Sequence, residues 1–133
     1  FHLALVSGEL LDQKGPIPTY HPVITAQLYF ESGGQMEWAL PTSHNSLIYV
    51  LEGSLIVNGE EIGERQMAWL QDEAATTVKC EATEKGKGIL LSGRPIKERL
   101  ATYGPFVMNT QREIMQALED ARSGAMGALE EQF

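Results

Sequence analysis

Histidine, cysteine and carboxylate side chains are the groups of this 133-residue chain that could bind a metal or carry acid–base chemistry. A mononuclear metal site needs about three or four such groups converging on one point. The three histidines, His2, His21 and His44, lie in separate segments and form no H-x-H or H-x3-H pair. We therefore predict no metal site within these residues.

Covalent catalysis has little support in the residue pattern. Cys80 stands in a strand-like run between Lys79 and Glu81, where a buried, unreactive thiol is the default. A G-x-S-x-G motif is absent. His44, just ahead of an apolar run, is either a polar group at the mouth of a ligand site or a solvent-facing loop histidine. We predict no catalytic residue.

Composition narrows the class of protein. The formal net charge of −8 would repel nucleic acid rather than attract it, so we expect no direct nucleic-acid partner. No apolar run approaches the roughly 20 residues of a membrane span. Cys80 is the single cysteine and cannot form an intrachain disulfide, which fits a reducing, cytoplasmic compartment. The first residue is Phe1 rather than Met, within a strand-like run, so we expect a piece of a longer polypeptide.

The elements that must position these side chains are short strands separated by turns that contain glycine. The predicted strands cover residues 2–7, 23–31, 35–40, 47–52, 54–57, 60–63, 66–70, 74–80 and 88–92. Residues 9–20 contain Lys14-Gly15-Pro16 and Pro18 and are predicted to be a connecting loop. This spacing is typical of an all-β sandwich or jelly roll.

The stretch 47–59 is the clearest local signal. Asn58-Gly59 between apolar runs predicts a tight hairpin turn, because that turn needs two residues that tolerate positive φ. Residues 47–51 are all apolar, whereas a half-buried strand would alternate. We therefore expect both faces of this strand to be covered, one by the opposite sheet and the other by a partner or a missing domain.

The pattern changes to a helix near the end of the chain. Thr110 and Glu113 form a capping box, and Ile114, Leu118 and Ala121 follow at helical spacing. We predict a jelly roll over residues 1–109, a helix of the same domain over 110–124, and a disordered tail over 125–133.

The central strand also resembles the first motif of the cupins, small double-sheet barrels that often hold a metal. In the pattern G-x5-H-x-H-x3-4-E-x6-G, Gly53 matches the last glycine and Ser46 stands in the glutamate position. The two histidine positions hold Ala39 and Pro41, or Leu40 and Thr42 with the shorter spacing. In the second motif, Ala74 stands at the histidine position. The resemblance therefore implies a barrel whose ligand positions are vacant.

Residues 91–98 (LSGRPIKE) and 103–110 (YGPFVMNT), followed by the capped helix, resemble the C-terminal region of the pirin family. Gly8-Glu9 and the run YVLEG resemble pirins as well. Pirins are bicupins that hold iron in the N-terminal domain, so this resemblance implies the metal-free C-terminal cupin, with iron and the partner domain outside these residues.

Three functions remain open. The first is the supporting half of an iron-dependent, quercetin 2,3-dioxygenase-like enzyme. The second is an interaction module of a pirin-like transcriptional co-regulator with a protein partner. The third is a stand-alone cupin that binds a small ligand. The resemblance also suggests an inter-domain seam. Its candidate residues are Pro95, Tyr103, Pro105 and Phe106.

Overall fold

The computed structural model describes residues 1–70 and 77–129 of the chain. It divides into two compact units, Phe1–Pro95 and Ile96–Phe133. We call the first the barrel unit and the second the hairpin unit, and each is described by itself. The division falls at Pro95, ahead of the boundary at residue 109 that the sequence suggested, so the membership of the helix in the jelly-roll domain stays a prediction.

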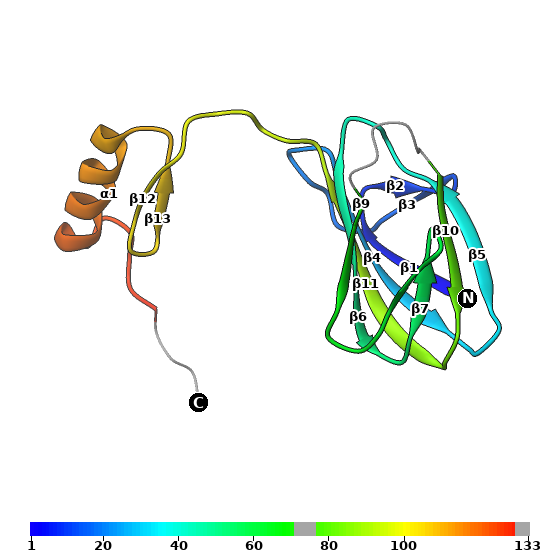
Figure 1. The fold of residues 1–133 in the computed structure, drawn as a ribbon. Coiled ribbons are helices and arrows are strands. Elements are labelled where there is room, and N and C mark those ends of the chain that lie inside the picture. Colours follow the sequence, from blue (N-terminus) through cyan, green and yellow to red (C-terminus); the bar gives the residue numbers. More distant parts are fainter. Residues whose placement is uncertain (71–76, 130–133) are drawn as a thin grey trace. The chain divides into compact units, whose positions relative to one another are not determined.

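The barrel unit consists of two facing antiparallel sheets (Figure 1). The five-stranded sheet has the order β1-β4-β11-β6-β9 and the four-stranded sheet has the order β5-β10-β7-β8. The strands of the first are β1 (His2–Ser7), β4 (Val23–Phe30), β11 (Gly86–Gly93), β6 (Asn45–Glu52) and β9 (Met67–Leu70). Those of the second are β5 (Gln35–Ala39), β10 (Thr77–Ala82), β7 (Leu55–Val57) and β8 (Glu60–Ile62). The predicted all-β cupin-type architecture is confirmed.

The core lies between the two sheets because side chains on each strand alternate between faces. In β4, for example, Ile24, Ala26, Leu28 and Phe30 are buried, whereas Gln27 and Tyr29 between them are exposed. Met36, Trp38 and Leu40 contribute to the core from the side of the opposite sheet. Trp38 is only 2% exposed and is therefore a core residue.

The central hairpin forms as predicted. Leu55–Val57 pairs with Glu60–Ile62, and the turn residues Asn58 and Gly59 have φ of 49° and 90°. The opposite sheet covers one face of the preceding strand, as expected, and cover of the other face by a partner or a missing domain stays a prediction. In β6, Ser46, Ile48 and Val50 are buried, but Leu47 and Tyr49 are only half-buried and Leu51 is 38% exposed.

A small hairpin replaces part of the predicted loop over residues 9–20. Strands β2 (Glu9–Leu10) and β3 (Gln13–Lys14) pair through a turn at Leu11 and Asp12. Both turn residues have positive φ, 51° and 57°, without a glycine at either position. The usual sequence signal for this turn is therefore missing.

The hairpin unit contains β12 (Ala101–Tyr103), β13 (Phe106–Met108) and α1 (Gln111–Ser123). The helix packs on the hairpin and buries Ile114 and Ala117, and Ala101 of β12 is buried as well. The Thr110 Oγ1 atom accepts from the Glu113 backbone N–H at 3.3 Å, as the capping box predicted. The Glu113 carboxylate, however, accepts from the Thr110 hydroxyl at 2.7 Å.

The end of the helix also follows its sequence signal. Gly124 caps it with a φ of 78°. Residues 125–129 are exposed and lie beyond the helix, and the predicted disorder of the last four residues falls outside the described part of the chain.

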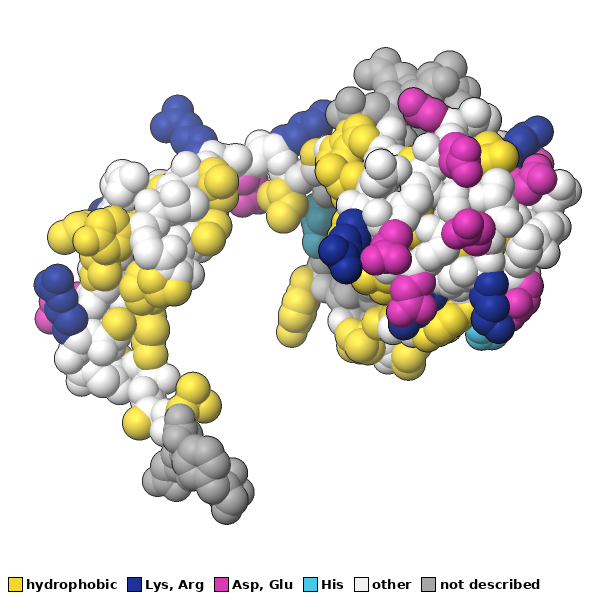
Figure 2. Space-filling view, turned by 60° about the horizontal axis from the view of Figure 1, so that its bottom comes forward, with side chains coloured by type: hydrophobic (Ala, Val, Ile, Leu, Met, Phe, Trp, Pro, Cys, Tyr) yellow, Lys and Arg dark blue, Asp and Glu magenta, His cyan; other side chains and the backbone are white. Residues whose placement is uncertain are grey.

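Acidic side chains are spread over the barrel unit, as Figure 2 shows for one face. The whole chain has 18 Asp and Glu against 10 Lys and Arg, which gives the formal net charge of −8. In the described ranges, no helix is both long enough and apolar enough to cross a membrane.

Candidate functional site

A chain of three polar side chains lies at the start of β6, where the cupin resemblance placed a glutamate. Ser46 and Ser92 are cross-strand partners of β6 and β11, and they are only 4% and 5% exposed. The Ser46 hydroxyl donates to Ser92 Oγ at 2.7 Å, and Ser92 Oγ lies 3.0 Å from His44 Nδ1. Ser92 Oγ accepts from Ser46 and can either donate its own hydrogen to His44 Nδ1 or accept a second one from it, so the donor in this contact depends on the tautomer of His44.

The surroundings of His44 favour the neutral form of its ring. Burial lowers the pKa of His44, and the positive charges of Arg94 and His21 lower it further. His21 Nε2 lies 2.6 Å from the Arg94 carbonyl oxygen and must donate to it, because a carbonyl only accepts. The Arg94 N–H in turn donates to the Pro22 carbonyl at 3.1 Å. These contacts hold the end of β11 against the segment before β4.

A serine beside a histidine could in principle form a nucleophile and its base. Ser92, however, is buried between the sheets at 5% exposure and already accepts from the Ser46 hydroxyl. In the ranges 1–70 and 77–129, no carboxylate is recorded in a hydrogen bond with His44, so its ring lacks the third, orienting group of a triad. The arrangement is therefore a polar hydrogen-bond network that closes one end of the core.

Two other vacant ligand positions lie at the end of β5. Ala39 and Pro41 are exposed, while Leu40 between them is buried. The Pro41 carbonyl accepts from the His44 N–H at 3.0 Å, so a tight turn joins this pair of positions to the serine–histidine network. Ala39, Leu40 and Pro41 also line an open pocket of about 640 Å³ with residues 9–14 of the β2–β3 hairpin. Ala74, the remaining vacant position, lies outside the described residues.

These side chains do not fit an iron site. Ala39 and Pro41 have no side-chain donor atom, and the Ser46 hydroxyl is engaged with Ser92. Over the described ranges, no three His, Cys, Asp or Glu side chains lie close enough to hold a metal ion. Ser92 belongs to this site but was not among the residues predicted from the sequence. It could have been found as a polar residue at an inward position of an otherwise apolar strand.

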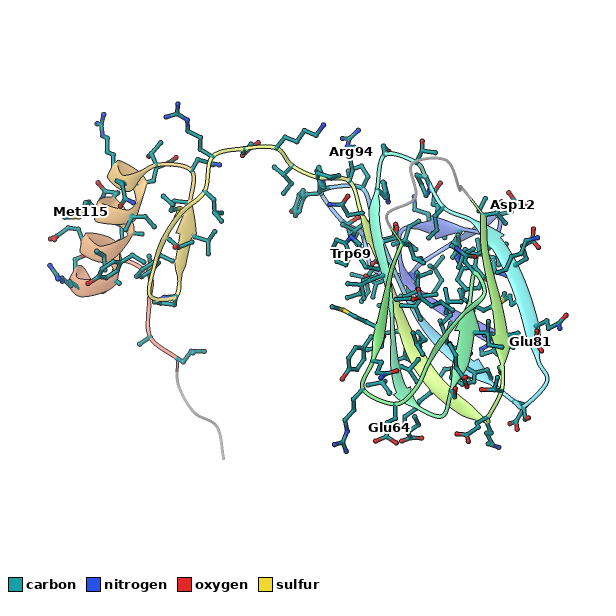
Figure 3. The ribbon with its side chains drawn as sticks, in the orientation of Figure 1. Asp12, Glu64, Trp69, Glu81, Arg94 and Met115 are labelled. Atoms are coloured by element: carbon teal, nitrogen blue, oxygen red, sulfur yellow. The ribbon has the colours of Figure 1, made fainter. Side chains whose placement is uncertain are left out.

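Cys80 and the two tryptophans have distinct environments. Cys80 is buried in β10, and burial raises the pKa of its thiol to about 12, so the thiolate needed for reactivity is suppressed. Trp38 lies in the core, whereas Trp69 on β9 is 48% exposed. Figure 3 shows Trp69 at the outer side of the five-stranded sheet. The exposed tryptophan is thus a candidate for contact with a partner.

The four candidate seam residues are divided between the units. Pro95 is half-buried at the end of the barrel unit, and the other three lie in the hairpin unit. Tyr103 pairs with Phe106 across the β12–β13 hairpin, and Pro105 lies in the turn between them. Tyr103 is 61% exposed and Phe106 is half-buried. The structure of each unit leaves the seam as a prediction.

Comparison with known proteins identifies the relatives of this chain. The Pirin C-terminal cupin domain family matches residues 25–127. A Pseudomonas aeruginosa protein named "Putative quercetin 2,3-dioxygenase" is 41% identical over 102 residues, which cover 74% of this chain and 35% of that protein. Human pirin is 27% identical over 129 residues, covering 94% of this chain and 44% of pirin.

A solved structure gives the same result. The crystal structure of a quercetin 2,3-dioxygenase from Acinetobacter baumannii superposes with a TM-score of 0.88 at 33% identity, covering 97% of this chain and 45% of that one. The chain therefore spans less than half the length of these relatives. The match over most of its residues and the shared barrel show that it belongs to the pirin family, as a C-terminal cupin domain.

Proposed function

We propose that this chain is the non-metal-binding half of a two-cupin protein and that it supports an iron-bearing N-terminal cupin with quercetin 2,3-dioxygenase-like activity. The observation that carries the proposal is that the residues in the cupin ligand positions cannot bind a metal. Ala39, Pro41 and Ser46 provide no ligand set, yet the surrounding barrel keeps its two sheets and its core. A barrel preserved without its ligands is expected where its role is structural.

Two features support this role. The names of two relatives, from Pseudomonas aeruginosa and Acinetobacter baumannii, refer to quercetin 2,3-dioxygenase, and each relative is more than twice as long as the part that matches. In addition, Ser46, Ser92 and His44 are hydrogen-bonded to one another, so these contacts link β6 to β11 without a ligand. Catalysis would then belong to the other half of the protein.

The test is metal analysis and flavonol turnover on the full-length protein and on the 133-residue chain. We expect iron and turnover in the full-length protein, and neither in the chain alone. Stoichiometric, tightly held iron in the chain alone would contradict the proposal. Full-length protein that contains iron but does not turn over flavonols would favour the second function, an interaction module of a co-regulator.

The pocket beside the β2–β3 hairpin gives the third function its specific support. At about 640 Å³ it is large enough for a small molecule, and it contains the side chains of Glu9, Asp12 and Lys14. Binding of a small ligand there by a chain that needs no partner would favour the stand-alone cupin. We rank it below the supporting role because the pocket is open and its vacant positions, Ala39 and Pro41, contribute no polar side chain.

A further inference from the structure

The outer face of the five-stranded sheet has an apolar surface that nothing in the barrel unit covers. It consists of two cross-strand rows, defined by the register of β9, β6 and β11. One row is Trp69, Leu47 and Leu91; the other is Met67, Tyr49 and Ile89. We call these six residues the apolar face.

The exposure of these side chains is high for their type. Met67, Trp69 and Leu91 are 57%, 48% and 42% exposed, and the other three are half-buried by their neighbours in the rows. Isolated exposed apolar residues are ordinary, but a contiguous apolar surface on a sheet marks an interaction site. The six residues are adjacent by register, so they form such a surface.

Polar residues adjoin both rows on β4, which gives the apolar face a boundary on that side. The rows continue onto β4 as Thr25, opposite Leu91, and Gln27, opposite Ile89. Lys87 lies next along β11, where it forms an ion pair with Glu52 at 2.7 Å. An apolar centre flanked by polar and charged residues is the usual composition of a protein–protein interface.

We propose that the apolar face is the surface on which the N-terminal cupin half of the same polypeptide docks; this inference rests on the proposed function. The matched family is a C-terminal domain, and the relatives extend over more than twice the matched length, so they contain a second large body next to this one. A flat row of side chains on a sheet fits such a body better than a small molecule. The small-molecule pocket of the barrel unit lies elsewhere, beside the β2–β3 hairpin.

The apolar face also explains the run of apolar residues in β6. Residues 47–51 alternate inward and outward, so Ile48 and Val50 enter the core while Leu47 and Tyr49 face outward. Burial of the outward set stabilises an assembly by about 25 cal/mol per Å² of apolar surface. The strand is therefore suited to packing on both sides when its partner is present.

The experiment measures thiol labelling at two substituted positions. Met67→Cys reports on the apolar face. Ile17→Cys is the matched control because Ile17 is 55% exposed, against 57% for Met67, and bridges Ser7 of β1, at the edge of the sheet opposite β9. Cys80 gives little background, since it is buried and its thiol pKa is raised to about 12. Mass spectrometry of the labelled peptides separates each site from any cysteine of the N-terminal half.

In the 133-residue chain we expect Met67→Cys and Ile17→Cys to be labelled at similar rates. In the full-length protein, labelling of Met67→Cys should slow by about tenfold or more, whereas that of Ile17→Cys should not change. Equal labelling of Met67→Cys in the two proteins would overturn the proposal, and so would equal slowing at both positions. If labelling of Met67→Cys in the 133-residue chain slows as the concentration of that chain rises, the surface binds a second copy of the chain. That result would also overturn the proposal.

These outcomes differ from those of the proposed function. If the full-length protein binds iron and turns over flavonols while Met67→Cys stays reactive, the docking surface is wrong and the supporting role stands. If it has neither iron nor turnover, the proposed function fails whatever the labelling shows. As a second variant, Trp69→Glu should expose Met67→Cys to labelling again in the full-length protein. Gln27→Glu, at an already polar position of β4, should not.

Discussion

At the scale of single residues, the side chains in the cupin ligand positions determine the chemistry of this barrel. Ser46 stands where the motif has a glutamate, and its hydroxyl donates a hydrogen bond to Ser92. Ser92 then reaches His44, which is held neutral by burial and by the nearby positive charges of Arg94 and His21. Because burial and these charges oppose protonation of the ring, the stability of the folded chain depends on pH through His44.

This response gives a prediction for pH. The pKa of His44 is lowered in the folded chain, so between the folded value and the ordinary value near 6.5 the unfolded chain binds more protons. Stability from His44 is therefore present above about pH 6.5 and is lost as the pH falls through the folded pKa. Urea unfolding from pH 8 to pH 5 should show a larger loss for the wild-type chain than for His44→Gln. Parallel pH profiles for the two proteins would contradict this assignment.

At the scale of elements, Gly53 shows how a motif position acts through the backbone. Its φ is 79°, and a Cβ on it would lie 2.4 Å from the Lys85 carbonyl oxygen. Gly59 has a similar φ of 90° but open space around it. The two glycines thus separate the effect of conformation from the effect of a steric clash.

We predict that Gly53→Ala destabilises the chain more than Gly59→Ala. For Gly59→Ala, only the left-handed conformation contributes, at about 1–2 kcal/mol. For Gly53→Ala, the clash with backbone adds about 1–3 kcal/mol more. Urea unfolding of the two variants measures the difference directly. Equal losses would show that the backbone at Lys85 moves away without cost.

The elements that the sequence predicted and those it missed differ in their turn chemistry. Asn58-Gly59 and Gly124 gave unmistakable signals because each needs positive φ at a residue that tolerates it. The β2–β3 hairpin was missed because Leu11 and Asp12 adopt positive φ without glycine. The β12–β13 hairpin was missed because its strands are three residues each, too short for an alternating pattern to show.

Residues of the candidate site that belong to one sequence motif could be predicted, but the residue that a paired strand contributes could not. Counting along the cupin pattern found Ser46, and His44 stood out as one of three histidines. Ser92, which joins them, is 46 residues from Ser46, and only the pairing of β6 with β11 brings it there. Register of this kind is fixed by tertiary packing, which a single sequence does not reveal.

At the scale of the whole molecule, the open question is how the 133-residue chain associates with the rest of its polypeptide. The barrel unit contributes the apolar face, and the hairpin unit contributes the candidate seam residues Tyr103, Pro105 and Phe106. Aromatic and proline side chains lose little conformational entropy on docking, so a rigid hairpin is suited to an interface. The seam is therefore testable independently of the apolar face.

Tyr103 and Val107 provide a matched pair for that test, because they are 61% and 60% exposed on the same hairpin. Tyr103 pairs with Phe106, whereas Val107 pairs with Thr102 on the opposite face. We expect Tyr103→Asp to raise the Kd between the separately expressed halves by about tenfold or more, as for a buried aromatic anchor, and Val107→Asp to leave it unchanged. Phe106→Asp should weaken association as well, but Phe106 is half-buried, so its effect includes loss of packing within the hairpin unit. Isothermal titration calorimetry gives each Kd, and an unchanged value for both Tyr103→Asp and Phe106→Asp would remove the seam from the interface.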